Sequence, residues 1–233
     1  MKKRPPGLSA PAITLAQRSS HREPIARRSS ARQRIASTTN TPIATDATVA
    51  HICVEKASPG VDFDGVFAKY VTVPASILWV NPPDFPWELG AVMEPFGIGV
   101  HAALEGTGVS GQTVVVNGCG PIGLMNIAVA RALGASMVIA VEPLAARREA
   151  AGRMGADLAI DPTEQDARSV VYDATHGRGA DVVIEYSGQL AGLNACIEML
   201  TIGGSLRLCA TPSGPVEYAF TPWKTKRPTI PNI

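Results

Sequence analysis

The sequence predicts an α/β fold in which a doubly wound parallel sheet is covered by helices on both faces. Short apolar runs alternate with helical patterns over the second half of the 233-residue chain. The first of these runs leads directly into a glycine loop and then an apolar helix, which is the context that a Gly-x-Gly-x-x-Gly spacing requires. With 45% hydrophobic residues and four widely spaced cysteines, the chain also fits a globular protein with reduced thiols rather than a disulfide framework.

Residues 1–48 differ from the rest of the chain in composition. The net charge is +1, but residues 1–50 carry nine basic side chains against two acidic ones. Arg, Ser, Ala, Thr and Pro dominate without a sustained apolar period, so we expect a disordered basic tail. A mitochondrial targeting segment, a basic arm for nucleic acid and an extension without function all fit this composition. We expect a cytoplasmic location, no membrane span and no nucleic-acid partner, since apolar runs are short and no basic groove with stacking aromatics is evident.

The first ordered elements are expected between residues 49 and 104. Residues 65–74 mix aromatic and β-branched side chains with partial alternation, which is typical of a strand. Residues 86–88 suit a first helical turn. Pro95 is expected to break that helix, with a second helix over residues 97–104.

Five strands and two marked helices are expected farther along the chain. One helix is indicated by apolar residues at helical spacing and ends at Gly134; its markers are Ile122, Met125, Val129 and Leu133. The other is indicated by Leu193, Ile197 and Leu200. The strands are expected at residues 113–116, 137–141, 158–160, 181–185 and 205–209. The chain is thus divided into a tail and three further parts, over residues 1–48, 49–85, 86–221 and 222–233.

The glycine loop is the motif that indicates chemistry. Gly118, Gly120 and Gly123 follow the strand expected at residues 113–116. Gly118 permits a tight turn, Gly120 lets a pyrophosphate approach the backbone, and Gly123 allows the helix to pack closely on the strand. The helix N-terminus offers N–H groups and a partial positive charge to phosphates. This is the dinucleotide fingerprint of the Rossmann fold, and a methyltransferase-type loop is the alternative.

Glu142, at the end of the next strand, favours NAD as the cofactor. A carboxylate at this position can accept hydrogen bonds from both ribose hydroxyls and would repel a 2′-phosphate. Arg147 and Arg148 follow it, and an arginine just past the second strand can instead pair with the extra phosphate of NADP. Because Glu142 is present, we expect NAD rather than NADP.

Five motifs occur in register: Gly-Val-Phe-Ala-Lys-Tyr at 65–70, Met-Glu-Pro-Phe-Gly at 93–97, the glycine loop at 118–123, the segment 142–147, and Gly203-Gly204. Together they resemble the zinc-dependent medium-chain dehydrogenases over about residues 51–220. The Glu-Pro-Phe-Gly form is most similar to the L-threonine 3-dehydrogenase branch, with the polyol dehydrogenases next. The resemblance implies an NAD-binding Rossmann domain at residues 86–221. It also implies that residues 49–85 are a remnant of the N-terminal barrel-like domain that holds the catalytic zinc.

The resemblance also implies roles for single residues. Glu94 corresponds to the acidic residue near the catalytic zinc, as a ligand or in a proton relay. The positions that it places against the cofactor are Ile122, Glu142, Arg147, Cys209, Ala210 and Thr211. Cys53 resembles the last of four cysteines around a structural zinc, but the other three are not matched. The region that would supply the remaining catalytic ligands is the Arg/Ser-rich tail, so we expect zinc to be lost.

The C-terminal residues 222–233 depart from the family pattern. Pro222, Pro228 and Pro231 occupy the stretch in which the family has a further strand, and proline cannot donate to a sheet ladder. We therefore expect an irregular tail and no family-like dimer. By resemblance, the function is hydride transfer between NAD and a small secondary alcohol, threonine-like or a polyol. A catalytically silent nucleotide-binding fragment and a zinc-independent enzyme similar to quinone reductases are the alternatives.

Overall fold

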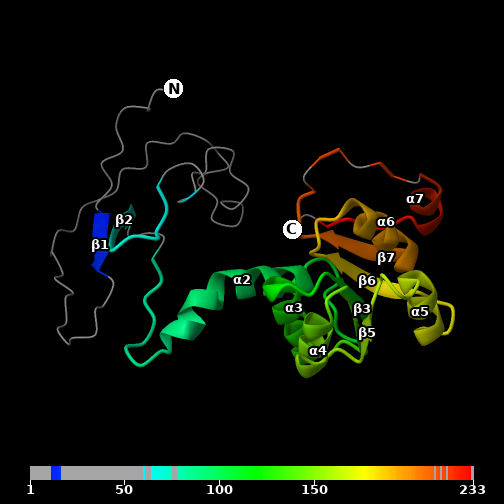
Figure 1. The fold of residues 1–233 in the computed structure, drawn as a ribbon, viewed down its shortest axis with the longest axis horizontal. Coiled ribbons are helices and arrows are strands. Elements are labelled where there is room, and N and C mark those ends of the chain that lie inside the picture. The colour runs from blue at the N-terminus through cyan, green and yellow to red at the C-terminus, as the bar shows by residue number, and fades with distance from the viewer. Residues whose placement is uncertain are drawn as a thin grey trace. The chain divides into compact units, whose positions relative to one another are not determined.

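The computed structural model describes residues 12–16, 60, 64–74, 78–212, 214–215, 217–218 and 220–231. These residues fall into two compact units, Met1–Pro83 and Asp84–Ile233 (Figure 1). Cys53 and most of residues 1–48 lie outside the described residues. In the described part of the chain, no helix is both long and apolar enough to cross a membrane.

The first unit contains an antiparallel pair of strands. Strand β1 (Ala12–Ala16) pairs with β2 (Tyr70–Pro74) from Ala12↔Pro74 to Ala16↔Tyr70. Strand β1 lies within residues 1–48, for which the sequence predicts a disordered tail; the other residues of that range lie outside the described part of the chain. The five-residue run Ala-Ile-Thr-Leu-Ala alternates in size and includes two β-branched residues, but its partner lies more than fifty residues away in sequence. Strand β2 is also shorter than the expected strand at 65–74.

Helix α2 (Trp87–Leu104) opens the second unit and runs through Pro95 without a break. The expected interruption at this residue is thus wrong. Proline removes one hydrogen bond and costs about 3 kcal/mol in a helix interior, and the bonds of the flanking turns hold an 18-residue helix together despite that cost. The last turn of α2 is anchored in the core by Ala102 and Ala103, both fully buried.

The second unit is built on a five-stranded parallel sheet of order β5-β4-β3-β6-β7. Its strands are β3 (Thr113–Asn117), β4 (Met137–Val141), β5 (Leu158–Ile160), β6 (Ala180–Glu185) and β7 (Leu200–Leu208). The Rossmann-type doubly wound sheet expected from the sequence is confirmed. The strand order reverses between β3 and β6, which creates a topological switch point.

Helices cover both faces of this sheet (Figure 1). They are α3 (Pro121–Ala132), α4 (Ala145–Arg153), α5 (Ala167–Ala174) and α6 (Leu190–Met199). On one face, Val114 and Val116 of β3 share a cluster with residues of α2, α3 and α4. On the other, Val115 of β3 shares a cluster with residues of α5 and α6. All three valines are fully buried, which is why the central strands appear as continuous apolar runs.

The C-terminal segment has more order than an irregular tail over residues 222–233. Helix α7 (Phe220–Lys226) has Pro222 in its first turn, where a missing N–H leaves no helical hydrogen bond unmade. Thr229 then forms a parallel bridge with Ser205. The amide of Leu206 donates to the Thr229 carbonyl at 2.9 Å, and the Thr229 amide donates to Gly204 at 2.9 Å. The edge of β7 is therefore covered at this point by one residue.

Candidate cofactor site

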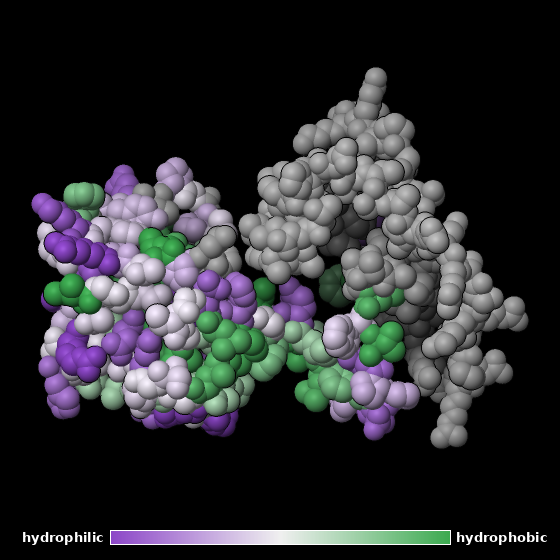
Figure 2. Space-filling model, turned by 180° about the vertical axis from the view of Figure 1, so that it is seen from behind, coloured by the Kyte–Doolittle hydropathy of each residue, from purple (hydrophilic) through white to green (hydrophobic). Residues whose placement is uncertain are grey.

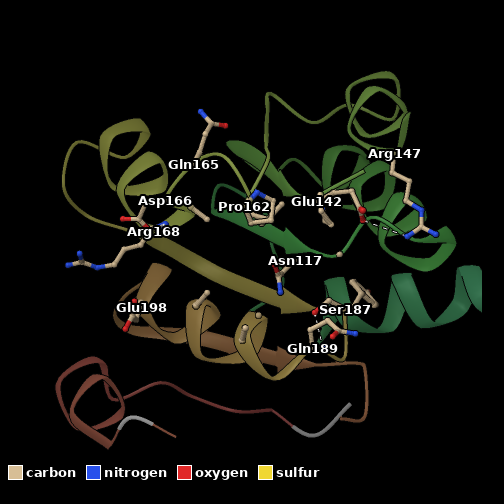
Figure 3. Close-up of a pocket in the computed structure, with 18 of the residues that line it drawn as sticks. Asn117, Glu142, Arg147, Pro162, Gln165, Asp166, Arg168, Ser187, Gln189 and Glu198 are labelled. Atoms are coloured by element: carbon tan, nitrogen blue, oxygen red, sulfur yellow. Dashed lines mark hydrogen bonds and ion pairs between the residues drawn. The ribbon is translucent and has the colours of Figure 1, made fainter. Parts of the chain in front are cut away.

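A cleft of about 760 Å³ opens at the carboxyl edge of the sheet, around the switch point between β3 and β6 (Figure 3). The loops after β3, β4, β5 and β6 line it, together with α6. Glu142 and Arg147 lie at one end of the cleft, whereas Arg168 and Glu198 lie at the other. Because parallel strands end at the same edge, motifs that are far apart in sequence meet here.

The three glycines of the fingerprint have different structural roles. Gly118 has φ +94°, and a Cβ there would lie 2.8 Å from the amide nitrogen of Ser187. A Cβ on Gly123 would lie 2.1 Å from the Gly118 carbonyl oxygen, so Gly123 is required for packing the helix on the strand. Gly120 has no atom within 4 Å of its Cβ position and lines the cleft. Its open side is thus the place where a ligand can approach the backbone.

Gly120 is also the N-cap of α3, and no side chain caps it. The first amides of a helix lack intrahelical acceptors and carry a partial positive charge. Pro121 occupies the first helical position, where its missing N–H costs nothing. An anionic group in the cleft can therefore accept hydrogen bonds from the start of α3, which fits the pyrophosphate of a dinucleotide.

Glu142 is held in place by backbone amides. Its side chain is only 4% exposed; Oε2 accepts from the Cys119 amide at 2.8 Å and Oε1 from the Leu144 amide at 3.1 Å. Each carboxylate oxygen has a further lone pair, so Glu142 can still accept hydrogen bonds from the hydroxyls of a ribose. Nη1 of Arg147 lies 3.8 Å from Oε2 of Glu142, and both residues line the cleft (Figure 3).

A second buried carboxylate, Glu185, lies at the end of β6. Its Oε1 accepts from Nδ2 of Asn117 at 3.1 Å and from the Ser187 amide at 2.8 Å, and Oε2 accepts from the Gly188 amide at 3.1 Å. The Ser187 hydroxyl also donates to it. Sequence reasoning missed this network, although a glutamate that ends an apolar strand at a switch point was a usable signal. Asn117 and Ser187 line the cleft, so the network sets the shape of its wall.

The remaining residues that the resemblance assigned to the cofactor lie at different depths. Ile122 and Gly123 are in the first turn of α3. Cys209, Ala210 and Thr211 follow β7, and the amides of Cys209 and Ala210 donate to the Glu185 carbonyl at 3.0 and 3.2 Å. Burial raises the pKa of the Cys209 thiol to about 11, so this thiol is neutral at physiological pH. The structure thus places these three residues beside the end of β6, outside the lining of the cleft.

Glu94 is exposed on α2. Among the described residues, no group of three or more His, Cys, Asp and Glu side chains is placed to hold a metal ion. A zinc ion needs about four ligands in a structural site and three in a catalytic one. The donor set of the described residues therefore does not fit zinc.

Comparison with known proteins agrees with this geometry. Residues 121–231 match a family described as "Zinc-binding dehydrogenase". L-threonine 3-dehydrogenase of Symbiobacterium thermophilum is 42% identical over 167 residues, which are 72% of this chain and 47% of that protein. The Pyrococcus horikoshii protein of the same name is 42% identical over 170 residues, 73% of this chain and 49% of its own length. The chain thus spans about half the length of these relatives.

Solved structures give the same result. Galactitol-1-phosphate dehydrogenase from Escherichia coli superposes with a TM-score of 0.74 at 26% identity, over 81% of this chain and 57% of that one. For 2R,3R-butanediol dehydrogenase from Bacillus subtilis the TM-score is 0.68 at 30% identity, over 75% and 50% of the two chains. Over the matched half, the chain is therefore similar in sequence and in fold to the zinc-type medium-chain dehydrogenases.

Proposed function

We propose that this chain binds NAD in the cleft at the carboxyl edge of its sheet and forms the cofactor half of an alcohol dehydrogenase. The observation that carries the proposal is the open side of Gly120 next to the buried carboxylate of Glu142. A phosphate fits the open side of Gly120, and a ribose diol fits the carboxylate of Glu142. The two features lie on adjacent strand ends, as the two halves of one dinucleotide site require.

Each part of the cofactor has a partner of suitable chemistry. The start of α3 would hold the pyrophosphate, since its amides have no side-chain cap. Glu142 would accept from the ribose hydroxyls, and its negative charge would disfavour the 2′-phosphate of NADP. Arg147, 50% exposed, is free to pack over the ribose or reach toward a phosphate while it partly balances the charge of Glu142. When bound, NAD supplies the acceptor for a hydride.

The names of similar proteins support a proposal for the substrate class. Proteins similar to this chain are named for the oxidation of threonine, butanediol and galactitol 1-phosphate. Threonine, butanediol and galactitol 1-phosphate each contain a secondary alcohol group. We therefore propose a small secondary alcohol as substrate of the protein to which this half belongs.

Gly120→Val tests the proposal directly. The valine side chain would fill the space left for the pyrophosphate, so calorimetric titration of this variant should show no saturable NAD binding, whereas the original chain binds NAD more tightly than NADP. Gly152→Val is the matched control: Gly152 on α4 also has nothing within 4 Å of its Cβ position but lies away from the cleft. Undiminished NAD binding by a folded Gly120→Val protein would contradict the proposed site.

Activity needs a separate assay. Oxidation of threonine and of butanediol is followed by NADH absorbance with and without a chelator, and bound zinc is measured on the same sample. Activity that the chelator abolishes supports a zinc-dependent enzyme, and activity that survives it supports a zinc-independent one. NAD binding without oxidation of either alcohol would support the silent nucleotide-binding fragment.

A further inference from the structure

Arg148 joins three segments around the ribose end of the cleft. Its Nη1 donates to the main-chain oxygens of Glu142 at 2.8 Å and of Pro143 at 2.5 Å. Its Nη2 lies 2.8 Å from Oδ2 of Asp161, the residue that follows β5. One guanidinium on α4 therefore ties the turn that carries Glu142 to the end of the neighbouring strand.

The turn between β4 and α4 depends on this contact. Leu144 is the N-cap of α4, and no side chain in the described part of the chain caps this helix start. The Glu142 amide donates to the Ile160 carbonyl at 3.0 Å, so the turn is also paired with β5 through its backbone. Arg148 completes this pairing on the carbonyl side, where the main-chain oxygens of Glu142 and Pro143 have no other hydrogen-bond donor in the described part of the chain.

Arg147 and Arg148 are adjacent in sequence but differ in their surroundings. The Arg147 side chain is 50% exposed and lines the cleft. The Arg148 side chain is 21% exposed, and its guanidinium faces Asp161 and the two carbonyls. Charge-assisted bonds of this kind are about twice as strong as neutral ones. Of these two adjacent arginines, Arg147 is the one that faces the cleft.

We infer that Arg148, held by Asp161, is a positioning residue for cofactor choice. By fixing the backbone of Glu142 it fixes the direction in which the carboxylate meets the ribose, and so it favours NAD without touching it. This inference rests on the proposed NAD site. The alternative is a role for Arg148 as a direct partner of the 2′-phosphate of NADP, and the two roles predict opposite changes in the preference for NAD over NADP when Arg148 is removed.

Arg148→Met in the full chain separates the two roles. If Arg148 positions Glu142, the Kd for NAD rises roughly tenfold, the Kd for NADP changes little, and the preference for NAD shrinks. If Arg148 instead binds the 2′-phosphate, the Kd for NADP rises and the Kd for NAD is unchanged. The second result overturns the inference, as does an unchanged ratio of the two constants.

Two further variants complete the experiment. Arg153→Met removes the same charge from α4, but Arg153 pairs with Glu149 at 2.6 Å and is 64% exposed, so both affinities should stay unchanged. Asp161→Asn leaves the guanidinium in place and weakens its anchor, and we expect weaker NAD binding in the same direction as for Arg148→Met. If Arg148→Met does not fold, as judged by circular dichroism, unchanged NAD affinity in Asp161→Asn overturns the inference.

These outcomes can be distinguished from a failure of the proposed NAD site itself. An original chain that binds no NAD refutes the proposed function before any variant is compared. An original chain that binds NAD, together with Arg148→Met that binds it equally well, refutes only the positioning role.

Discussion

Replacing Glu142 by Gln should weaken both the fold and the cofactor site, because one carboxylate serves both. The carboxylate accepts from the amides of Cys119 and Leu144, one through each oxygen. Glutamine has the same shape but only one accepting end. One of the two amides would therefore face an NH2 group and lose its acceptor.

The size of the effect follows from this lost bond. A hydrogen bond to a charged acceptor contributes about 1.5–3 kcal/mol, so we expect the free energy of unfolding to fall by about 2 kcal/mol. For a chain of this length that corresponds to a decrease in Tm of roughly 4–8 °C. The affinity for NAD should fall roughly tenfold and that for NADP less, since the 2′-phosphate no longer meets a negative charge.

Thermal unfolding and calorimetric titration of the same samples measure both effects. Glu149→Gln is the control, because the Glu149 side chain is 75% exposed and pairs with Arg153 on the surface of α4. That change should stay within about 0.5 kcal/mol of the original stability and leave both affinities alone. A folded Glu142→Gln protein with the original Tm and the original ratio of affinities would refute the double role of this carboxylate.

Two predictions concern residues outside this carboxylate. The hydroxyl of Ser169 lowers the pKa of Asp166, the N-cap of α5, below its usual 3.8. Because the pKa of Asp166 is lower in the folded state than in the unfolded state, its carboxylate stabilises the fold above the unfolded pKa, and this stabilisation is lost as the pH falls. In urea unfolding, the free energy of unfolding of Asp166→Ala should lie below that of the unsubstituted chain at about pH 6, and the difference should shrink toward about pH 3. Arg207 is fully buried and donates to the carbonyls of Ala102 and Ala103 in the last turn of α2 and of Gly108 in the loop that follows. Arg207→Met should therefore lower the free energy of unfolding by about 3 kcal/mol, and a loss below about 1 kcal/mol would contradict this role.

The sequence predicted the sheet domain well because its signals are local. Strands β4 and β5 have the expected bounds, since each is an apolar run between clear breaks. The helix marked from Ile122 to Leu133 is α3, which ends at Ala132 just before Gly134. The glycine loop and Glu142 also face one cleft as expected, because adjacent parallel strands end at the same edge.

The errors come from contacts that a local pattern does not contain. Pro95 is tolerated inside α2, whose last turn is held by the core and by Arg207, a residue about a hundred positions away. Strand β1 exists through its pairing with β2. The difference between Arg147 and Arg148 depends on Asp161, which follows another strand. In each case the deciding partner is remote in sequence.

The two buried carboxylates at the carboxyl edge differ in how many hydrogen bonds the described residues donate to them. Glu185 accepts from four protein donors, supplied by Asn117, Ser187 and Gly188, and this uses most of the lone pairs of its carboxylate. Among the described residues, Glu142 accepts hydrogen bonds from two amides, and it lines the cleft. A buried carboxylate needs several donors to offset its loss of hydration, and Glu142 has fewer from the protein. Under the proposed function, ribose hydroxyls would supply further donors, and bound NAD would complete the hydrogen bonding of Glu142.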